Sequence, residues 1–157
     1  RRQRQMCIRD SNLTAYENLK VRALALGLSD ERISEVLTTV QLTNTGKKKT
    51  GRFSLGMKQR LGIALALLAQ PKLLILDEPT NGLDPIGIQD LRKLIRSFSA
   101  KGITVILSSH ILSEVELIAD HIGIISNGKL GYEGEVHKDV DLEHIFMEVV
   151  GNTRGEG

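Results

Sequence analysis

Two adjacent carboxylates, Asp77 and Glu78, directly follow the apolar run Leu73–Leu76. Four aliphatic residues in a row fit a short strand that is buried on both faces of a parallel sheet. Ligands of open α/β sheets bind beyond the carboxyl ends of the strands, which is where these acids lie. Asp77 therefore suits Mg²⁺, and Glu78 suits a general base that activates water against a terminal phosphoryl group. An ordinary strand end with a solvated acidic pair is the alternative.

A second group of residues, Phe53–Met57, opens a predicted helix shortly before the acidic strand. Ser54 is a good N-cap, and Gly56 allows a phosphate to approach the backbone closely. The free N–H groups and the positive end of the helix dipole favour an anion there. Taken alone, this segment is typical of an ordinary helix cap. Its place just before two acids favours phosphate binding.

Two more polar residues follow the acidic strand. His110 comes after a predicted strand through two serines, which places it at the same sheet edge as Glu78. A neutral imidazole there could hydrogen-bond a phosphate oxygen, although a packed or solvent-facing histidine is the alternative. Asp84 is expected to cap the helix that begins at Pro85.

The elements that must position these residues change character along the chain. Apolar periodicity and capping signals predict helices over 12–26, 29–40 and 54–69, with a polar loop over 44–52. From residue 73 onward strands and helices alternate, which indicates a βαβ sheet. The predicted elements are strand 73–77, helix 85–99, strand 103–108, helix 111–119, strands 122–126 and 129–133 across a hairpin turn, a weak helix over 139–148 and a frayed tail over 151–157.

Composition limits the class of protein. The 157 residues are 41% hydrophobic and 25% charged, enough for a globular core. A net charge of +2 and an aromatic content of 3% argue against a nucleic-acid-binding surface. The longest apolar stretch, near 63–69, is too short to span a bilayer, and a single cysteine excludes an internal disulfide and a cysteine-cluster metal site. With no secretory signal apparent, we expect a soluble cytoplasmic domain.

Residues 1–11 are expected to be foreign to the protein. The segment 5–11 has no useful apolar periodicity, and one reading frame of a transposon-end adapter used in sequencing libraries translates to this peptide. We predict an adapter artefact at the edge of a truncated gene, with a disordered native terminus as the alternative. On this interpretation Cys7 and the arginine-rich start take no part in the fold.

Together these motifs resemble the nucleotide-binding domain of ATP-binding cassette transporters over about residues 12–135. In this resemblance Leu73–Glu78 matches the Walker B strand, which makes Asp77 the magnesium acid and Glu78 the catalytic base. His110 matches the switch histidine. The resemblance thus implies catalytic roles for Glu78 and His110 and a metal-binding role for Asp77.

The resemblance also covers the helix starts. Phe53–Met57 looks like the signature motif and Asn81–Asp84 like the D-loop. Leu55 stands where the signature motif usually has its first glycine, and Met57 where it has glutamine, which leaves fewer phosphate donors. The nucleotide-contacting residues that the resemblance implies are Ser54, Leu55, Gly56, Met57 and Asp84.

The implied fold class is α/β: a P-loop NTPase-like, mostly parallel sheet flanked by helices, with an all-α subdomain on its N-terminal side. The expected divisions are a helical subdomain over 12–52, a catalytic core over 53–135, and a C-terminal helix and tail over 136–157. The Walker A pattern G-x-x-x-x-G-K-[ST] occurs nowhere in the sequence. We therefore expect this fragment alone to be inactive as an ATPase.

The function that the resemblance implies is that of an ATP-hydrolysing exporter subunit, with ATP and Mg²⁺ as cofactors. The motif Ser-Leu-Gly-Met-Lys-Gln-Arg is typical of exporters similar to bacitracin and lantibiotic self-protection transporters. The implied partners are a transmembrane permease and a second nucleotide-binding domain in a head-to-tail dimer, and no nucleic acid. The protein would sit on the inner face of the plasma membrane through its permease. A cassette ATPase acting on nucleic acid or in translation, or a non-catalytic remnant, are the alternatives.

Overall fold

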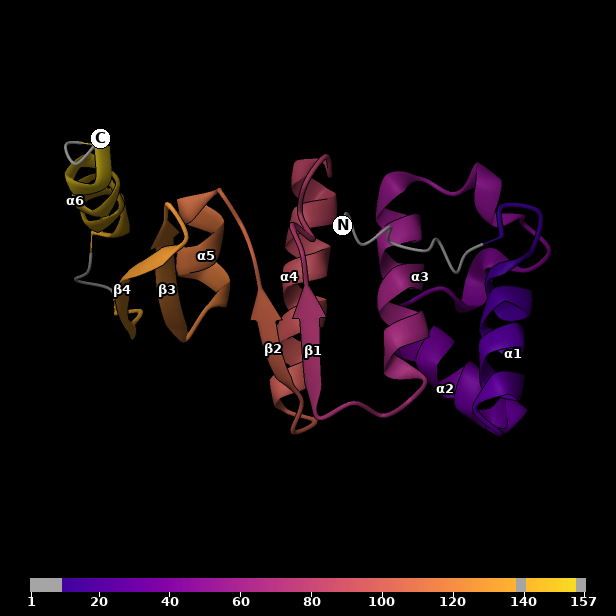
Figure 1. The fold of residues 1–157 in the computed structure, drawn as a ribbon. Helices are drawn as coiled ribbons and strands as arrows, with labels where there is room; N and C mark the ends of the chain where they lie inside the picture. Colours follow the sequence, from indigo (N-terminus) through magenta and orange to yellow (C-terminus); the bar gives the residue numbers. More distant parts are fainter. Residues whose placement is uncertain (1–9, 138–140, 155–157) are drawn as a thin grey trace. The chain divides into compact units, whose positions relative to one another are not determined.

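The computed structural model describes residues 10–137 and 141–154, which divide into a first unit ending at Leu107 and a second unit beginning at Ser108 (Figure 1). Most of the segment predicted to be an adapter artefact, residues 1–9, lies outside the described residues. Its origin stays a prediction.

The first unit begins with a helical part. It contains α1 (Ala15–Ala25), α2 (Asp30–Thr39), the 3₁₀ turns η1 (Thr43–Thr45) and η2 (Thr50–Arg52), and α3 (Leu55–Leu67). Helix α3 packs against both α1 and α2. Apolar spacing predicts that Ile33, Val36 and Leu37 of α2 and Leu61, Ala64, Leu65 and Leu68 in or just after α3 face inward. All of them are buried except Leu65, which is half-buried. The core of this part consists of Leu19, Ala23, Ile33, Val36, Leu37, Val40, Leu42, Phe53, Leu61, Ala64 and Leu68.

The start of α1 matches the predicted capping box. The Thr14 hydroxyl accepts from the Glu17 amide at 3.2 Å, and the Glu17 carboxylate accepts from the Thr14 amide at 2.7 Å. Apolar spacing predicts an inward face made of Tyr16, Leu19, Ala23 and Leu26, and this was partly wrong, because Tyr16 and Leu26 are 39% and 41% exposed. The packed side of α1, which contacts α2 and α3, is therefore narrower than its apolar pattern suggests.

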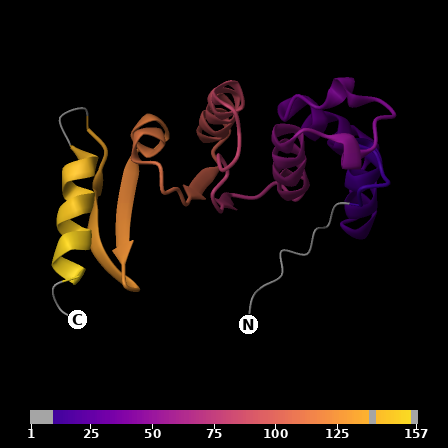
Figure 2. The ribbon, with the colours of Figure 1, turned by 90° about the horizontal axis from the view of Figure 1, so that it is seen from above.

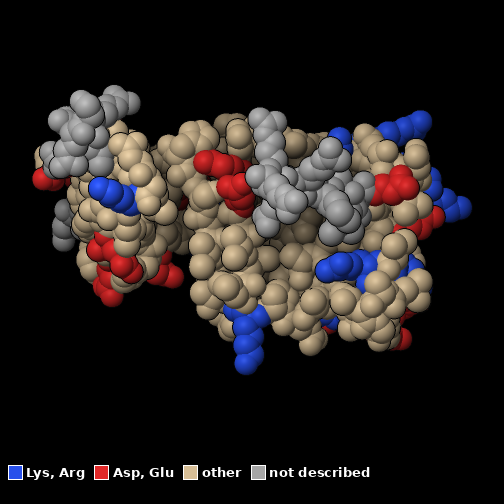
Figure 3. All heavy atoms as spheres, viewed as in Figure 1, with Lys and Arg blue, Asp and Glu red and all other residues tan. Residues whose placement is uncertain are grey.

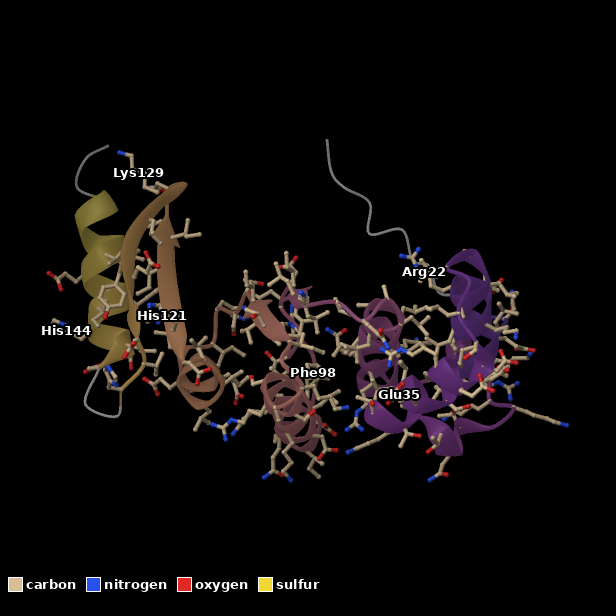
Figure 4. The ribbon with its side chains drawn as sticks, turned by 90° about the horizontal axis from the view of Figure 1, so that it is seen from below. Arg22, Glu35, Phe98, His121, Lys129 and His144 are labelled. Carbon is tan, nitrogen blue, oxygen red and sulfur yellow. The ribbon has the colours of Figure 1, made fainter. Side chains whose placement is uncertain are left out.

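The first unit then forms the predicted βαβ segment. Strand β1 (Leu73–Leu76) leads through α4 (Pro85–Ser99) to β2 (Thr104–Leu107), and β1 pairs with β2 in parallel with Leu76 opposite Leu107. Helix α4 lies against one face of this pair, as two views of the ribbon show (Figures 1 and 2). Phe98 of α4, labelled in Figure 4, is fully buried.

The prediction that the acidic strand is buried on both faces was wrong for the described residues. Leu74 is buried, but Ile75 is 69% exposed and Leu73 is 48% exposed. Ile106 on the neighbouring strand is also exposed. The reason is that α4 packs on one face of these two strands, and Ile75 and Ile106 lie on the opposite face.

The second unit holds α5 (Leu112–Ile118), β3 (His121–Ser126), β4 (Lys129–Glu135) and α6 (Leu142–Arg154). Strands β3 and β4 form the predicted antiparallel hairpin, and Asn127 and Gly128 both take positive φ in its turn. Among the described residues, β3 pairs with β4 alone, so the hairpin is a sheet of its own. Helix α6 packs on the hairpin (Figure 2).

The last helix differs from its prediction. It begins at Leu142 instead of 139 and continues to Arg154, so residues 151–154 of the predicted frayed tail are helical. The Asp141 carboxylate accepts from the His144 amide at 3.0 Å and caps the helix start. Gly151 carries no side chain but keeps its amide donor, so it weakens the helix by only about 1 kcal/mol without ending it. Residues 155–157 lie outside the described residues.

The described residues show no membrane span, and the one face in the space-filling view (Figure 3) shows no single charged patch. No described helix combines the length and the apolar character that crossing a bilayer requires. On the face that Figure 3 shows, lysine and arginine side chains are scattered among acidic and uncharged residues.

Candidate functional site

The two acids lie where the sequence places them, at the carboxyl end of β1. Asp77 is exposed and Glu78 is half-buried. Because Leu76 pairs with Leu107, β1 and β2 end at the same sheet edge. The carboxylates thus stand at the edge where an open α/β sheet binds its ligands.

The backbone holds Glu78 in an uncommon conformation. Its φ is +45°, in the left-handed region that L residues other than glycine rarely adopt. The segment that follows locks it in place: the Asn81 amide donates to the Glu78 carbonyl at 3.2 Å, and Pro79 and Thr80 are buried. Backbone strain that the surroundings enforce is typical of functional sites, where it fixes the direction of one side chain.

The signature segment forms the start of α3. Ser54 is the N-cap, and its hydroxyl accepts from the Met57 amide at 3.3 Å. A Cβ on Gly56 would meet only the Leu83 side chain, at 3.7 Å. The first turn of α3 therefore has an accessible backbone at Gly56 and a positive dipole end, a combination that suits a phosphate group.

The D-loop segment lies against this helix start. Gly82 has φ +75°, and a Cβ there would lie 2.9 Å from Leu55 Cδ2. Leu83 follows and faces Gly56. Asp84 caps α4, as predicted, because its carboxylate accepts from the Gly87 amide at 2.7 Å. The structure thus brings the two predicted motifs into direct contact.

A cavity of about 550 Å³ opens between these motifs, and both line it. Its wall also contains polar residues to which the sequence analysis gave no role, among them Gln41, Arg60 and Asp90. The Arg60 guanidinium donates to the Gln41 side-chain oxygen at 2.6 Å and to the Asp90 carboxylate at 2.9 Å. Arg60 lies three residues after the signature segment, and that position could have singled it out. Gln41 and Asp90 carried no comparable signal.

His110 belongs to the second unit, where it is exposed just before α5. The Ser109 hydroxyl before it accepts from the Ile111 amide at 3.1 Å and shapes the turn. The approach of His110 to Glu78 stays a prediction.

The acids fit a metal that needs few protein ligands. Within residues 10–137 and 141–154, no group of three or more His, Cys, Asp or Glu side chains could hold a metal ion. Mg²⁺ usually takes one or two carboxylates and completes its shell with waters and substrate phosphates. An exposed Asp77 beside an open sheet edge suits that mode of binding.

Comparison with known proteins decides the family. The family model described as "ABC transporter" matches residues 2–81. The chain belongs to the ABC transporter family. The matched range includes β1 and α3 of this ABC transporter chain, and it overlaps the segment predicted to be adapter sequence.

Curated relatives of this ABC transporter chain are ATP-binding subunits. The chain is similar to the lantibiotic transport ATP-binding protein of Streptococcus pyogenes, with 56% identity over 86% of this chain and 59% of that protein. It is also similar to the bacitracin transport ATP-binding protein of Bacillus licheniformis, with 59% identity over 76% of this chain and 40% of that protein. The chain thus spans about half the length of these relatives.

Solved structures give the same fold. An ATP-binding subunit of an ABC transporter superposes with a TM-score of 0.74 at 32% identity, over 89% of this chain and 63% of that one. A Clostridium perfringens subunit of an ABC transporter complex gives a TM-score of 0.75 at 28% identity, over 91% of this chain and 57% of that one. The predicted α/β, P-loop NTPase-like fold class is thereby confirmed.

Proposed function

We propose that the complete protein is the ATP-hydrolysing subunit of an exporter that removes a peptide antibiotic or another small amphiphile. The observation that carries this proposal is the similarity to lantibiotic and bacitracin transport ATP-binding proteins, at 56% and 59% identity. The contact between signature and D-loop segments supports it, because both segments line one cavity at the start of α3.

Each acid has a distinct role in this proposal. Asp77 would hold Mg²⁺, and that ion, when bound, would neutralise charge on the terminal phosphates. Glu78 would take the proton of the attacking water, because its strained backbone and the buried Pro79 and Thr80 direct the carboxylate. His110 would hold a phosphate oxygen through its imidazole.

The signature segment would serve a nucleotide held by a second copy of the domain. Ser54, Leu55, Gly56 and Met57 form the first turn of α3 and offer backbone N–H groups to phosphate oxygens. Asp84, at the cap of α4, would contact the second copy through the D-loop. This assignment implies a head-to-tail dimer in which each subunit supplies acids to one nucleotide and a helix start to the other.

The helical part would dock on a transmembrane permease at the inner face of the plasma membrane. Closure around ATP and opening after hydrolysis would move α1–α3 and so drive the permease. The scattered distribution of basic side chains on the surface in Figure 3 gives no support to an ATPase that acts on nucleic acid.

Replacing Glu78 in the complete protein tests the proposal. The variant Glu78→Gln should keep ATP binding, lose at least about 100-fold in turnover and accumulate as a closed dimer. Glu116→Gln, on the exposed side of α5, removes the same charge and should hydrolyse ATP normally. Turnover by Glu78→Gln that equals the turnover of Glu116→Gln would refute the assigned base.

A further inference from the structure

Two helices of the first unit end in the same hydrogen-bonded motif but with different residues at the critical position. After α1, the Leu28 amide donates to the Ala23 carbonyl at 2.9 Å, and Gly27 takes φ +66°. After α2, the Leu42 amide donates to the Leu37 carbonyl at 2.9 Å, and Gln41 takes φ +59°. Glycine is the usual residue here, because a side chain makes the left-handed conformation unfavourable.

The side chain of Gln41 makes a hydrogen bond that glycine could not make. Its amide oxygen accepts from the Arg60 guanidinium at 2.6 Å. The other end of that guanidinium donates to Asp90 at 2.9 Å, and the Arg60 side chain is 16% exposed. Arg60 therefore joins the end of α2, the signature helix α3 and the D-loop helix α4.

The position of Gln41, Arg60 and Asp90 matters because α3 begins with the signature segment and α4 follows the D-loop. Ser54 caps α3 and Asp84 caps α4, and Arg60 and Asp90 each lie less than two turns after the cap of their own helix. An ion pair at that distance fixes how far apart the two helix starts lie. Gln41, Arg60 and Asp90 line the same cavity as the signature and D-loop segments.

We propose that Gln41, Arg60 and Asp90 form a clamp. The clamp fixes the position of the signature helix α3 relative to the D-loop and joins both to the end of α2. Arg60 is a positioning residue: it acts through the start of α3, which contacts the nucleotide. This inference rests on the proposed function, because it concerns how the signature segment meets the ATP held by a second copy. It explains how movement of the helical part reaches both motifs at once.

The variant Gln41→Gly separates positioning from stability. It removes the clamp acceptor and at the same time relieves the left-handed strain, so its melting temperature should equal or exceed that of the parent. The experiment uses the complete protein carrying Glu78→Gln and follows ATP-driven dimer formation by size-exclusion chromatography. Gln41→Gly should need at least fivefold more ATP for half-maximal dimer. Its affinity for a fluorescent ATP analogue as a monomer should change less than twofold.

Two further variants complete the test. Asp90→Asn should raise the ATP concentration needed for half-maximal dimer, as Gln41→Gly does. Arg60→Lys should raise it less than Arg60→Ala does, because lysine keeps the positive charge. Lys20→Ala is the control, since it breaks the Lys20–Asp30 ion pair between α1 and α2 without touching the clamp. Lys20→Ala should dimerise like the parent.

The outcomes distinguish the two proposals. A Glu78→Gln parent that stays monomeric at every ATP concentration contradicts the proposed function, and with it the role of the clamp. If the parent dimerises and Gln41→Gly and Asp90→Asn dimerise identically, the clamp is refuted while the function stands. Amide hydrogen exchange on the 157-residue chain adds a readout independent of ATP. Residues 55–58 should exchange faster in Gln41→Gly and Asp90→Asn, and unchanged exchange there would also refute the clamp.

Discussion

Leu55 of the signature segment packs directly on Gly82 of the D-loop, so closely that a Cβ on Gly82 would lie 2.9 Å from Leu55 Cδ2. The predicted signature motif places Leu55 at the position where ABC transporter proteins usually have glycine. The larger residue on α3 therefore meets the smallest residue on the neighbouring loop. The two motifs fit each other in this chain through the pairing of leucine with glycine.

This contact predicts a small added cost for Gly82→Ala in the 157-residue chain. The new methyl group would meet Leu55 and would also sit at φ +75°. The contacted atom is the end of the Leu55 side chain, which is 49% exposed and can change rotamer. The control is Gly102→Ala, because Gly102 has φ +71° but nothing within 4 Å of a Cβ. Chemical denaturation should show that Gly82→Ala loses about 1 kcal/mol more than Gly102→Ala. Equal losses would mean that Leu55 yields without cost.

The buried hydroxyl of Thr80 predicts a gain in stability. Thr80 is 3% exposed, and its Oγ1 has no hydrogen-bond partner among the described residues. Thr80→Val keeps the shape and removes the desolvated hydroxyl, so the 157-residue chain should gain about 1 kcal/mol. Thermal unfolding measures this change, and Thr50→Val is the matched control. The Thr50 hydroxyl donates to the Asp10 carbonyl at 2.8 Å, so that variant should lose stability.

The cap of α4 predicts a difference between two N-cap replacements. Asp84→Ala should cost about 0.5–2 kcal/mol, because the Gly87 amide loses its acceptor. Asp84→Asn should retain most of that stability, since an amide oxygen can still accept. Ser29→Ala at the start of α2 should cost less than Asp84→Ala, because the Ser29 side chain makes no bond to the helix backbone. A larger loss for Ser29→Ala would contradict this account in denaturant titrations of the 157-residue chain.

The capping box of α1 predicts a dependence of stability on pH. Hydrogen bonds from Thr14, with a further contribution from Lys49, lower the pKa of Glu17. A carboxyl whose folded pKa is lowered stabilises the fold above its unfolded pKa, roughly 4.3 for glutamate, and loses that contribution as the pH falls through the folded value. Melting curves between pH 5 and pH 2 measure the effect.

The variant Glu17→Gln isolates this contribution, because glutamine can keep the capping contact but does not titrate. The loss of stability on acidification should be smaller in Glu17→Gln than in the parent chain. Identical pH profiles for the two would show that Glu17 has the same pKa in the folded and unfolded chain.

The sequence was sufficient for features that depend on local chemistry. The Thr14–Glu17 box, the Ser54 cap and the start of α4 at Pro85 all follow from side chains that bond within one helical turn. The parallel pairing of β1 and β2 follows from the strand–helix–strand order. Such signals do not depend on how distant parts of the chain pack.

Features that depend on contacts between distant residues were harder to predict. The pattern of four aliphatic residues gave no sign that Ile75 would be exposed, because burial depends on which elements cover the strand. Nothing near Gln41 or Asp90 indicated that Arg60 joins them, since these residues lie far apart in the sequence and meet only after packing. The positive φ of Glu78 likewise depends on the burial of Pro79 and Thr80 beside it.

The exposed side of β1 and β2 has a consequence for anyone who produces the 157-residue chain alone. Ile75 and Ile106 are partners in the ladder and both face outward, with Leu73 on the same side. Each of these strands also has an outer edge that, in the described residues, pairs with no further strand. Exposed apolar strands with unpaired edges promote association between copies of the chain. Purified protein should therefore scatter light, bind hydrophobic dyes and remain monomeric only in dilute solution.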